Sequence, residues 1–457
     1  MNEADYIKAF RFGFGVPRDG KFDPLAELEH PPAADAAAEK ELEDRISFLT
    51  AKQQMAKEER QAKMANADSP DAKAGKNKEL NQQVQTYHAQ DVHQTVLTAV
   101  NSDQMFTNRL CAFWSNHFAL GATSRFLRVT SGLYEPTAIR PNMFGSFYDL
   151  LVAAEFHPTM VMYLNLQESI GPNSKAGMRQ KKGLNENLGR EILELHTLGV
   201  DGGYVQADII AFSKILTGWH VERDTGQVIF TPNRAEPGSK KMLGKSFGGS
   251  DAKEQDAKDA LRFLADHPST ARFIAHKLAT HFVGPGNADL EKALEAEFKN
   301  SKGNLTSIYK VLLAHPSSST PLGKQTRNDF VFLVSALRAS AINPTAFALK
   351  TKEDGKPPGN PMTVGSMENL TQKLWAAPSP KGWPDDPGFW LSPTVIGARL
   401  RRIPAIVKHY EDEEPTAFAA RVLGPLLRPQ TLATIKLASN KQLALGLVLA
   451  SPEFNRS

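Results

Sequence analysis

The spacing of apolar residues predicts helices along most of the chain. Between residues 141 and 164, residues such as Leu150 and Leu151 recur at helical intervals. His157 and Pro158 divide this run, because proline disfavours helical geometry in the residue before it. Similar patterns predict helices at 92–118, 256–265, 269–282, 290–298, 305–314, 330–341 and 416–454.

One stretch differs from this helical pattern. Within 226–249, Val228 and Phe230 alternate with other residues around prolines and glycines, which predicts a small β-hairpin or ribbon. The 457 residues show no repeat with a period of 20–50 residues, so a solenoid is not supported. We therefore predict a mainly α protein, in which residues 1–457 form one large multi-helix domain with a single core.

A charged stretch at 33–94 stands out from this body. It is rich in Ala, Glu, Lys and Gln, while Leu42, Ile46 and Leu49 supply some helical periodicity. It predicts a projecting charged helical hairpin that is broken at 67–70. A disordered charged insert is the alternative.

Composition and charge exclude several classes of protein. The chain has 54 Lys and Arg against 50 Asp and Glu, for a net charge of +4, and no basic block that would favour nucleic-acid binding. No window approaches the roughly 18 apolar residues that a membrane-spanning helix needs. The first residues, Met-Asn-Glu-Ala-Asp-Tyr, do not read as a signal peptide, although a trimmed mature chain remains an alternative.

Residues 185–199 form the densest polar cluster within an apolar region. A helix over this segment places Leu188, Ile192 and Leu195 on one face. The opposite face carries the polar residues Glu186, Asn187, Arg190, Glu191, Glu194 and Thr197. Because Glu186, Arg190 and Glu194 follow at intervals of four, the guanidinium can bridge two carboxylates.

This polar face has two interpretations. One is a solvated ladder of salt bridges. The other is a site in which a glutamate is general base or metal ligand, Arg190 holds it ionised, and His196 carries a proton or ligates. The apolar surroundings favour a covered face, where carboxylates are paired or functional. His196 points away from the glutamates and equally suits a core or helix-cap histidine.

Aromatic and polar residues mark two further stretches. Phe113-Trp-Ser-Asn-His-Phe118 suits either a core helix end or a catalytic cluster. The loop from Pro378 to Trp390 suits either plugging the core or stacking on a flat ligand such as a sugar. The predicted catalytic residues are Glu186, Glu191, Glu194, His117 and His196. The predicted substrate-binding residues are Asn116, Asn187, Arg190, Trp114, Trp219 and Trp383.

Known short motifs give no further lead. The spacing of His117, His157 and His196 matches no compact zinc motif, so no metal is expected, and no cofactor is identified. Phosphate-binding glycine loops and the Gly-x-Ser-x-Gly elbow are both missing, which removes the usual nucleotide-binding and serine-hydrolase assignments.

Several of these stretches together resemble the bacterial family called "domain of unknown function 1800", from Arg11 to the C-terminus. The segments that carry the resemblance are Trp114-Ser-Asn-His-Phe118, Phe156-His-Pro-Thr-Met160 with Tyr163-Leu164, Asn185 to Gly199, Tyr204 with Asp208 and Leu216-Thr-Gly-Trp219, Pro378-Ser-Pro-Lys-Gly-Trp-Pro384, and Leu449-Ala-Ser-Pro-Glu-Phe454. The chain departs from the family in the segment from Ala235 to Lys240. In similar proteins this segment tends to begin with a histidine, whereas here it begins with Ala235.

The resemblance implies a mostly helical bacterial protein that is commonly exported, and a periplasmic or extracellular location. It also implies a gene neighbour that is sulfatase-like and uncharacterised. Two hypotheses follow. The first is an extracytoplasmic enzyme that acts on a carbohydrate-like or other cell-envelope polymer through the Glu/Arg/His helix. The second is a non-catalytic partner or assembly factor that docks another exported protein through its helical body and the 33–94 hairpin. The oligomeric state is not predicted.

Overall fold

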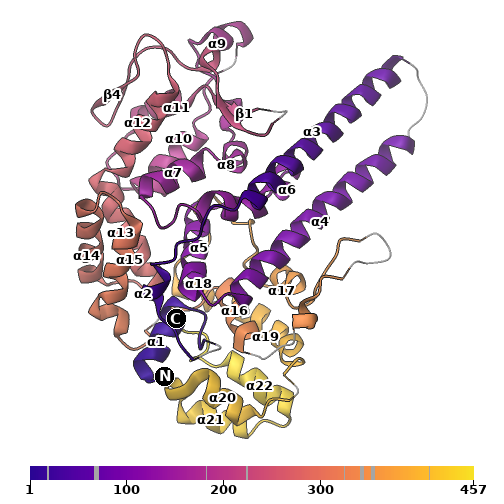
Figure 1. Ribbon diagram of the computed structural model, residues 1–457, viewed down its shortest axis with the longest axis vertical. Helices are drawn as coiled ribbons and strands as arrows, with labels where there is room; N and C mark the ends of the chain where they lie inside the picture. The colour runs from indigo at the N-terminus through magenta and orange to yellow at the C-terminus, as the bar shows by residue number, and fades with distance from the viewer. Residues whose placement is uncertain are drawn as a thin grey trace.

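The computed structural model describes residues 1–17, 20–65, 71–181, 183–222, 225–323, 325–339, 344–350, 356–410 and 412–457. These residues form 22 α-helices, several short 3-10 and π-helical turns, and four short strands (Figure 1). The prediction of a mainly α fold is confirmed. In the described part of the chain, no helix is both long enough and apolar enough to span a membrane.

Two long helices form the predicted hairpin. The N-terminal elements are α1 (Glu3–Phe12), α2 (Pro24–Glu27), α3 (Ala36–Ala65) and α4 (Asp71–Asn101). Figure 1 shows α3 and α4 running side by side away from the body. The predicted break at 67–70 lies outside the described residues.

The central helices surround the segments that carry the candidate site. They are α5 (Met105–His117), α6 (Arg125–Tyr134), α7 (Phe147–Glu155), α8 (Pro158–Tyr163), α9 (Lys175–Gln180), α10 (Asn187–Glu191) and α11 (Gln206–Leu216). The predicted break at His157 and Pro158 separates α7 from α8. His157 caps α8, because its Nδ1 accepts a hydrogen bond of 3.2 Å from the Thr159 amide.

Two small antiparallel hairpins follow, where the sequence predicted one. Their strands are β1 (Trp219–Val221), β2 (Val228–Phe230), β3 (Lys240–Met242) and β4 (Lys245–Phe247). Trp219 pairs with Phe230 in the first hairpin, so this hairpin begins before the predicted boundary at residue 226. In the second, Met242 pairs with Lys245 around a tight turn at Leu243 and Gly244.

The C-terminal half is again helical, as predicted. Its helices are α12 (Glu254–Ala265), α13 (Pro268–Phe282), α14 (Ala288–Asn300), α15 (Leu305–Ala314), α16 (Asp329–Ala339), α17 (Val364–Asn369), α18 (Pro387–Trp390), α19 (Pro393–Val407), α20 (Pro415–Leu423), α21 (Pro429–Lys436) and α22 (Lys441–Ala450). The predicted helical tail at 416–454 consists of three helices: Pro425 and Pro429 separate α20 from α21, and α22 begins after the Asn440 cap.

The apolar interior is divided into two large clusters, which the sequence did not predict. One gathers side chains of the central helices and of α12 to α15, and the other gathers α4, α16 and the helices from α19 onward. Helix α1 joins them, because Phe12 belongs to the first cluster and Phe10 to the second. Phe22 packs against both. The two clusters are therefore neighbouring parts of one body.

A buried ion pair fastens the hairpin to this body. Arg45 on α3 contacts both carboxylate oxygens of Asp91 on α4 at 2.7 and 2.8 Å. The same guanidinium donates to the Val129 carbonyl on α6 and lies 4.4 Å from the Tyr87 ring. Leu49 and its apolar neighbours pack beside it. The inner half of the hairpin is therefore fixed on α6.

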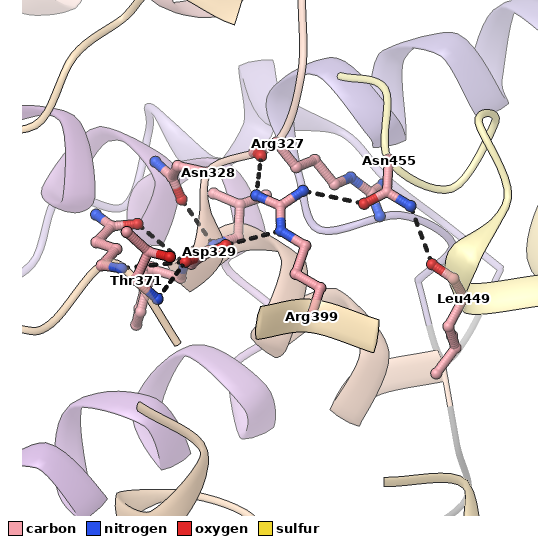
Figure 2. Close-up of polar contacts among 10 residues, drawn as sticks. Arg327, Asn328, Asp329, Thr371, Arg399, Leu449 and Asn455 are labelled. Atoms are coloured by element: carbon pink, nitrogen blue, oxygen red, sulfur yellow. Dashed lines mark hydrogen bonds and ion pairs between the residues drawn. The ribbon is translucent and has the colours of Figure 1, made fainter. Parts of the chain in front are cut away.

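A second buried network joins α16 and α19 to the chain after α22 (Figure 2). Arg399 on α19 donates to Asp329 on α16 at 2.7 Å, to the Asn455 side chain at 3.0 Å and to the Arg327 carbonyl at 2.6 Å. The other oxygen of Asp329 accepts hydrogen bonds from the amides of Thr371 and Gln372 at 2.8 and 3.0 Å. Asp329 and Arg399 are both almost completely buried.

We predict that Asp329→Ala destabilises the protein by about 3–5 kcal/mol, because it leaves the Arg399 guanidinium buried without its carboxylate. The measurement is the urea midpoint at an unchanged slope of free energy against denaturant. The matched control is Glu254→Ala, which breaks an exposed pair with Lys258 and should change the free energy by no more than about 0.5 kcal/mol. Equal losses in the two variants would contradict the prediction.

Candidate functional site

The polar segment 185–199 forms a helix, as predicted, but its second half is a π-helical turn. Helix α10 ends at Glu191, and Ile192–Thr197 continue with bonds from residue i to i+5. At the start, the Asn185 side chain accepts a hydrogen bond from the Asn187 amide at 3.0 Å. Gly199 ends the segment with a φ of +81°, a left-handed conformation that suits glycine.

The π-helical turn changes which side chains face the core. Leu188 and Ile192 are buried, as predicted, but the third buried apolar residue is Leu193, and Leu195 is only half-buried. Thr197, predicted on the polar face, is completely buried and donates to the Ile192 carbonyl at 2.6 Å. The extra residue in the turn rotates everything that follows it, which a regular helical wheel cannot represent.

Arg190 binds one glutamate of this face rather than bridging two. Its Nη2 lies 3.1 Å from Glu186 and 3.1 Å from the Gln206 side-chain oxygen on α11. Gln206 also donates to Glu186 at 2.8 Å. Glu186 and Arg190 are about one-third exposed, and Asn187 is exposed. These three residues hold the N-terminal end of α10 against α11. The described ion pair of Arg190 is with Glu186 and not with Glu191 or Glu194.

Glu191 and Glu194 are half-buried carboxylates that form no ion pair with any described residue. Burial raises the pKa of Glu191, and Glu194 and Glu155 raise it further, while His196 and Arg190 oppose them. Burial, and then the nearby Glu194 carboxylate, raise the pKa of Tyr204 to about 12. Burial, and then Glu191, also raise the pKa of Tyr163 on α8. Two carboxylates and two phenols thus share one half-buried surface.

His196 lies on the opposite side of the segment and is completely buried. Its Nδ1 is 2.6 Å from Glu155 Oε1 on α7, and Glu155 is also completely buried. The carbonyl of His196 is 3.1 Å from His117 Nε2 at the end of α5. Burial lowers the pKa of His117 well below its usual value, with smaller contributions from Lys277 and His196. The structure therefore brings His117 and His196 together, but behind the glutamates rather than beside them.

Asn116 fixes the aromatic loop after residue 378. Its side chain donates to the Trp383 carbonyl at 2.9 Å and accepts from the Trp383 amide at 2.8 Å. Gly382, at a φ of +82°, lies so close to Asn116 that a Cβ would come within 2.4 Å of the Asn116 carbonyl oxygen. Asn116 is thus held in the structure by the backbone of this loop.

The three predicted substrate-binding tryptophans have different surroundings. Trp114 is completely buried and donates to the Tyr309 hydroxyl at 2.6 Å. Trp219 is also buried and stacks on Phe156 with the ring centroids 4.2 Å apart. Trp383 is half-buried and lines two pockets. Only Trp383 is placed to touch a ligand in this structure.

A large cleft beside the hairpin was not found by sequence reasoning. Its volume is about 1030 Å³, and its lining includes His88 on α4, Arg128 on α6, Lys373 and Trp375. A smaller pocket shares Trp375 and Lys373 with this cleft and continues to Asn116 and Trp383. The only sequence signal was Trp375 in a polar stretch, because the other lining residues come from distant segments.

Tyr163 lies between the carboxylate surface and a backbone bridge at the edge of this cleft. Its ring lies against Gly121, where a Cβ would meet it at 3.0 Å, and Gly121 pairs with Ala376 in an isolated antiparallel bridge. Ala376 lines the cleft. Among the described residues, no group of three His, Cys, Asp or Glu side chains is arranged to hold a metal ion. The polar groups gathered here are carboxylates, phenols and the nearby histidines.

We predict that Glu155→Ala destabilises the protein by about 3 kcal/mol, because His196 loses its buried partner and a cavity opens. Glu155→Gln should cost much less, because its amide oxygen still accepts from His196 Nδ1. Urea denaturation of both variants checks this. A loss for Glu155→Gln as large as that for Glu155→Ala would show that the charge, not the hydrogen bond, holds His196.

The family segments named from the sequence meet in this region, through His117 and His196, Asn116 and Trp383, and Tyr163. Comparisons with curated proteins and with solved structures gave no match. The family model described as "Protein of unknown function (DUF1800)" matches residues 9–456, nearly the full length. The chain therefore belongs to the DUF1800 family of proteins of unknown function.

Proposed function

We propose that this protein is an extracytoplasmic enzyme that acts on a carbohydrate-like or other cell-envelope polymer, with Glu191 and Glu194 as its reacting carboxylates. The observation that carries the proposal is that both are half-buried and form no ion pair with any described residue. Carboxylates in such a position cost stability, so a chain retains them more readily where they serve a reaction.

The two carboxylates have different surroundings, which suits a division of roles. Burial and the neighbouring acids raise the pKa of Glu191, so this residue keeps a proton to higher pH and can act as a general acid. Glu194 lies close enough to Tyr204 to raise the pKa of that phenol, and it would act as the base or nucleophile. A pair of carboxylates with these roles is what glycoside hydrolysis requires.

The remaining predicted site residues support this pair in other ways. Glu186, Arg190 and Gln206 fix the start of α10, and His196 with Glu155 anchors its second half from behind. We place His117 and His196 as positioning residues, because both are buried away from the carboxylate surface. Trp114 and Trp219 contribute to the core.

The large cleft provides a path for a polymer. Its lining combines Trp375 with Arg128, Lys373 and several prolines, a mixture of flat apolar surface and hydrogen-bond donors that suits sugar rings. Tyr163 and the Gly121–Ala376 bridge lie between this cleft and Glu191. In this proposal, a chain bound in the cleft passes over the Gly121–Ala376 bridge and Tyr163 to reach the carboxylates.

We predict that Glu191→Gln and Glu194→Gln each lower turnover at least a hundredfold, as expected when a general acid or base is removed. The assay is release of soluble fragments or reducing ends from isolated cell-envelope polymers. In the wild type, turnover should fall as the pH rises through the raised pKa of Glu191, because the acid is then deprotonated.

Glu254→Gln, on the exposed surface of α12, is the control and should keep full turnover. Thermal unfolding should show that all three variants are folded. Unchanged turnover in Glu191→Gln and Glu194→Gln on an identified substrate would overturn the proposal.

A second candidate function is that of a partner or assembly factor for another exported, sulfatase-like protein. The observation that favours it is the hairpin, which projects from the body (Figure 1). Residues 51–55 of α3 are all exposed, and they include Met55. Exposed apolar side chains on a projecting element suit a docking surface.

We predict that replacing residues 51–82 by a short Gly/Ser linker abolishes complex formation while the protein stays folded. This change keeps Arg45, Asp91 and the inner contacts of the hairpin on α6. Co-purification with the exported partner measures binding, and thermal unfolding measures the fold. Retained binding by the shortened protein would exclude a docking role for the hairpin.

A further inference from the structure

The large cleft beside the hairpin has a surplus of positive charge in its lining. Its one described acidic side chain is Glu368. Its cationic side chains are Arg128, Lys350, Lys356 and Lys373. Residues 351–355, which lie outside the described part of the chain, contain one lysine and two acidic residues, so the balance stays positive even when all of them are counted. Because the whole chain has a net charge of only +4, this is a local concentration of charge.

Three of these cations are available to a ligand. Arg128, Lys350 and Lys373 are exposed, and none of them forms an ion pair with a described carboxylate. Arg128 donates through its Nε to the Ala122 carbonyl at 3.3 Å, which directs the side chain along the cleft wall and leaves its two terminal nitrogens for other acceptors. A guanidinium presents paired donors that match two oxygens of one anionic group.

Trp375 holds an aromatic ring at the wall of the same cleft, in an unfavourable backbone conformation. Its φ is +48°, in the left-handed region that residues other than glycine rarely adopt. Its carbonyl accepts a hydrogen bond from the Ala122 amide at 2.7 Å, and its half-buried ring packs against His88 with the centroids 5.8 Å apart. Strain of this kind gathers at binding sites, where the surrounding structure holds a residue in place for a ligand.

The opposite wall of the cleft is also fixed before any ligand arrives. Lys350 and Gly359 exchange two backbone hydrogen bonds of 3.0 Å, which close the proline-rich loop. The buried side chain of Asn360 donates to two backbone carbonyls at 2.9 and 3.0 Å and accepts from two amides at 2.8 and 3.2 Å. His93 on α4 contacts the Thr363 hydroxyl at 2.8 Å, which joins this loop to the hairpin. A preformed cleft of this kind pays little to order itself on binding.

We propose that this cleft binds an anionic polysaccharide, with a sugar ring stacked on Trp375 and carboxylate or sulfate groups paired with Arg128 and Lys373. A neutral polymer would use the ring and leave the cations without a counter-charge. The inference rests on the proposed function, because it names the class of polymer that would be carried toward Glu191 and Glu194.

A polysaccharide fits this lining better than a nucleic acid does. Single-stranded nucleic acids stack successive bases on several aromatic side chains. The described lining holds Trp375 as its one tryptophan, tyrosine or phenylalanine, beside prolines such as Pro357 and Pro358. One flat ring with dispersed cations suits a chain in which a sugar face and a charged group recur together.

The test measures binding of the full chain to four polymers by titration calorimetry in one buffer. Dextran and dextran sulfate share a backbone and differ in charge, alginate carries carboxylates, and single-stranded DNA carries phosphates without a polysaccharide backbone. Dextran sulfate or alginate should bind roughly tenfold more tightly than dextran and than the DNA, and the tighter of the two identifies the anionic group. Failure of both to exceed dextran, or equally tight binding of the DNA, would overturn the inference.

Variants test which side chains are responsible. Arg128→Gln combined with Lys373→Gln should weaken binding of the anionic polymer roughly tenfold and leave binding of dextran unchanged. The matched control, Lys408→Gln combined with Lys436→Gln, removes the same charge at exposed positions outside the lining and should bind like the wild type. Equal losses in these two double variants would show that only overall charge matters and would overturn the inference.

The ring is tested separately, because charge alone attracts many polyanions. Trp375→Ala should weaken binding of the anionic polymer about fivefold or more, whereas Trp375→Phe, which keeps a ring, should stay within about twofold of the wild type. Thermal unfolding checks that both are folded, and the exposed charge variants decide the matter if they are not. Unchanged binding in a folded Trp375→Ala protein would contradict the stacked arrangement.

Binding and turnover separate this inference from the proposed function. Tight binding of an anionic polysaccharide that is never cleaved would support the cleft assignment and count against the enzyme. Cleavage of a neutral polymer by a protein that binds no anionic one would support the enzyme and overturn the cleft assignment.

Discussion

The buried pair of Arg399 and Asp329 is the interaction on which the arrangement of the C-terminal half depends. Removing two charges from water costs several kcal/mol per ion, and mutual attraction offsets this only when the remaining polar atoms are also matched. Here they are matched by two backbone amides, one carbonyl and the Asn455 side chain. The result is a junction that holds four segments in one fixed arrangement and tolerates little change.

The segment 371–383 links this junction to the candidate site. It begins at the amides that Asp329 binds, and the carbonyl of Trp375 then accepts the Ala122 amide at 2.7 Å. It ends at Trp383, which Asn116 holds through two hydrogen bonds. Residues of this segment line the large cleft and both smaller pockets described above. The junction therefore fixes one wall of each of these cavities.

Local patterns predicted the helices but not the site's assembly. Apolar spacing and the proline rule act over a few residues, so the break at His157 and the helix at 185–199 could be predicted. Asn116 and Trp383 are 267 residues apart, and no local pattern encodes their contact. Trp114 and Trp383 lie in similarly polar stretches, yet only long-range packing decides that the first is buried and the second lines pockets.

The π-helical turn explains why glutamates in a repeating pattern have such different surroundings. A regular helix would place Glu186, Arg190 and Glu194 in one row of salt bridges. Exposed salt bridges of this kind contribute little to stability. Instead Arg190 is used by Glu186 and Gln206, and the turn directs His196 into the core. Glu191 is left half-buried, beside other acids that oppose its ionisation. A half-buried carboxylate that neighbouring acids push toward its neutral form singles out Glu191 more strongly than the spacing of the glutamates does.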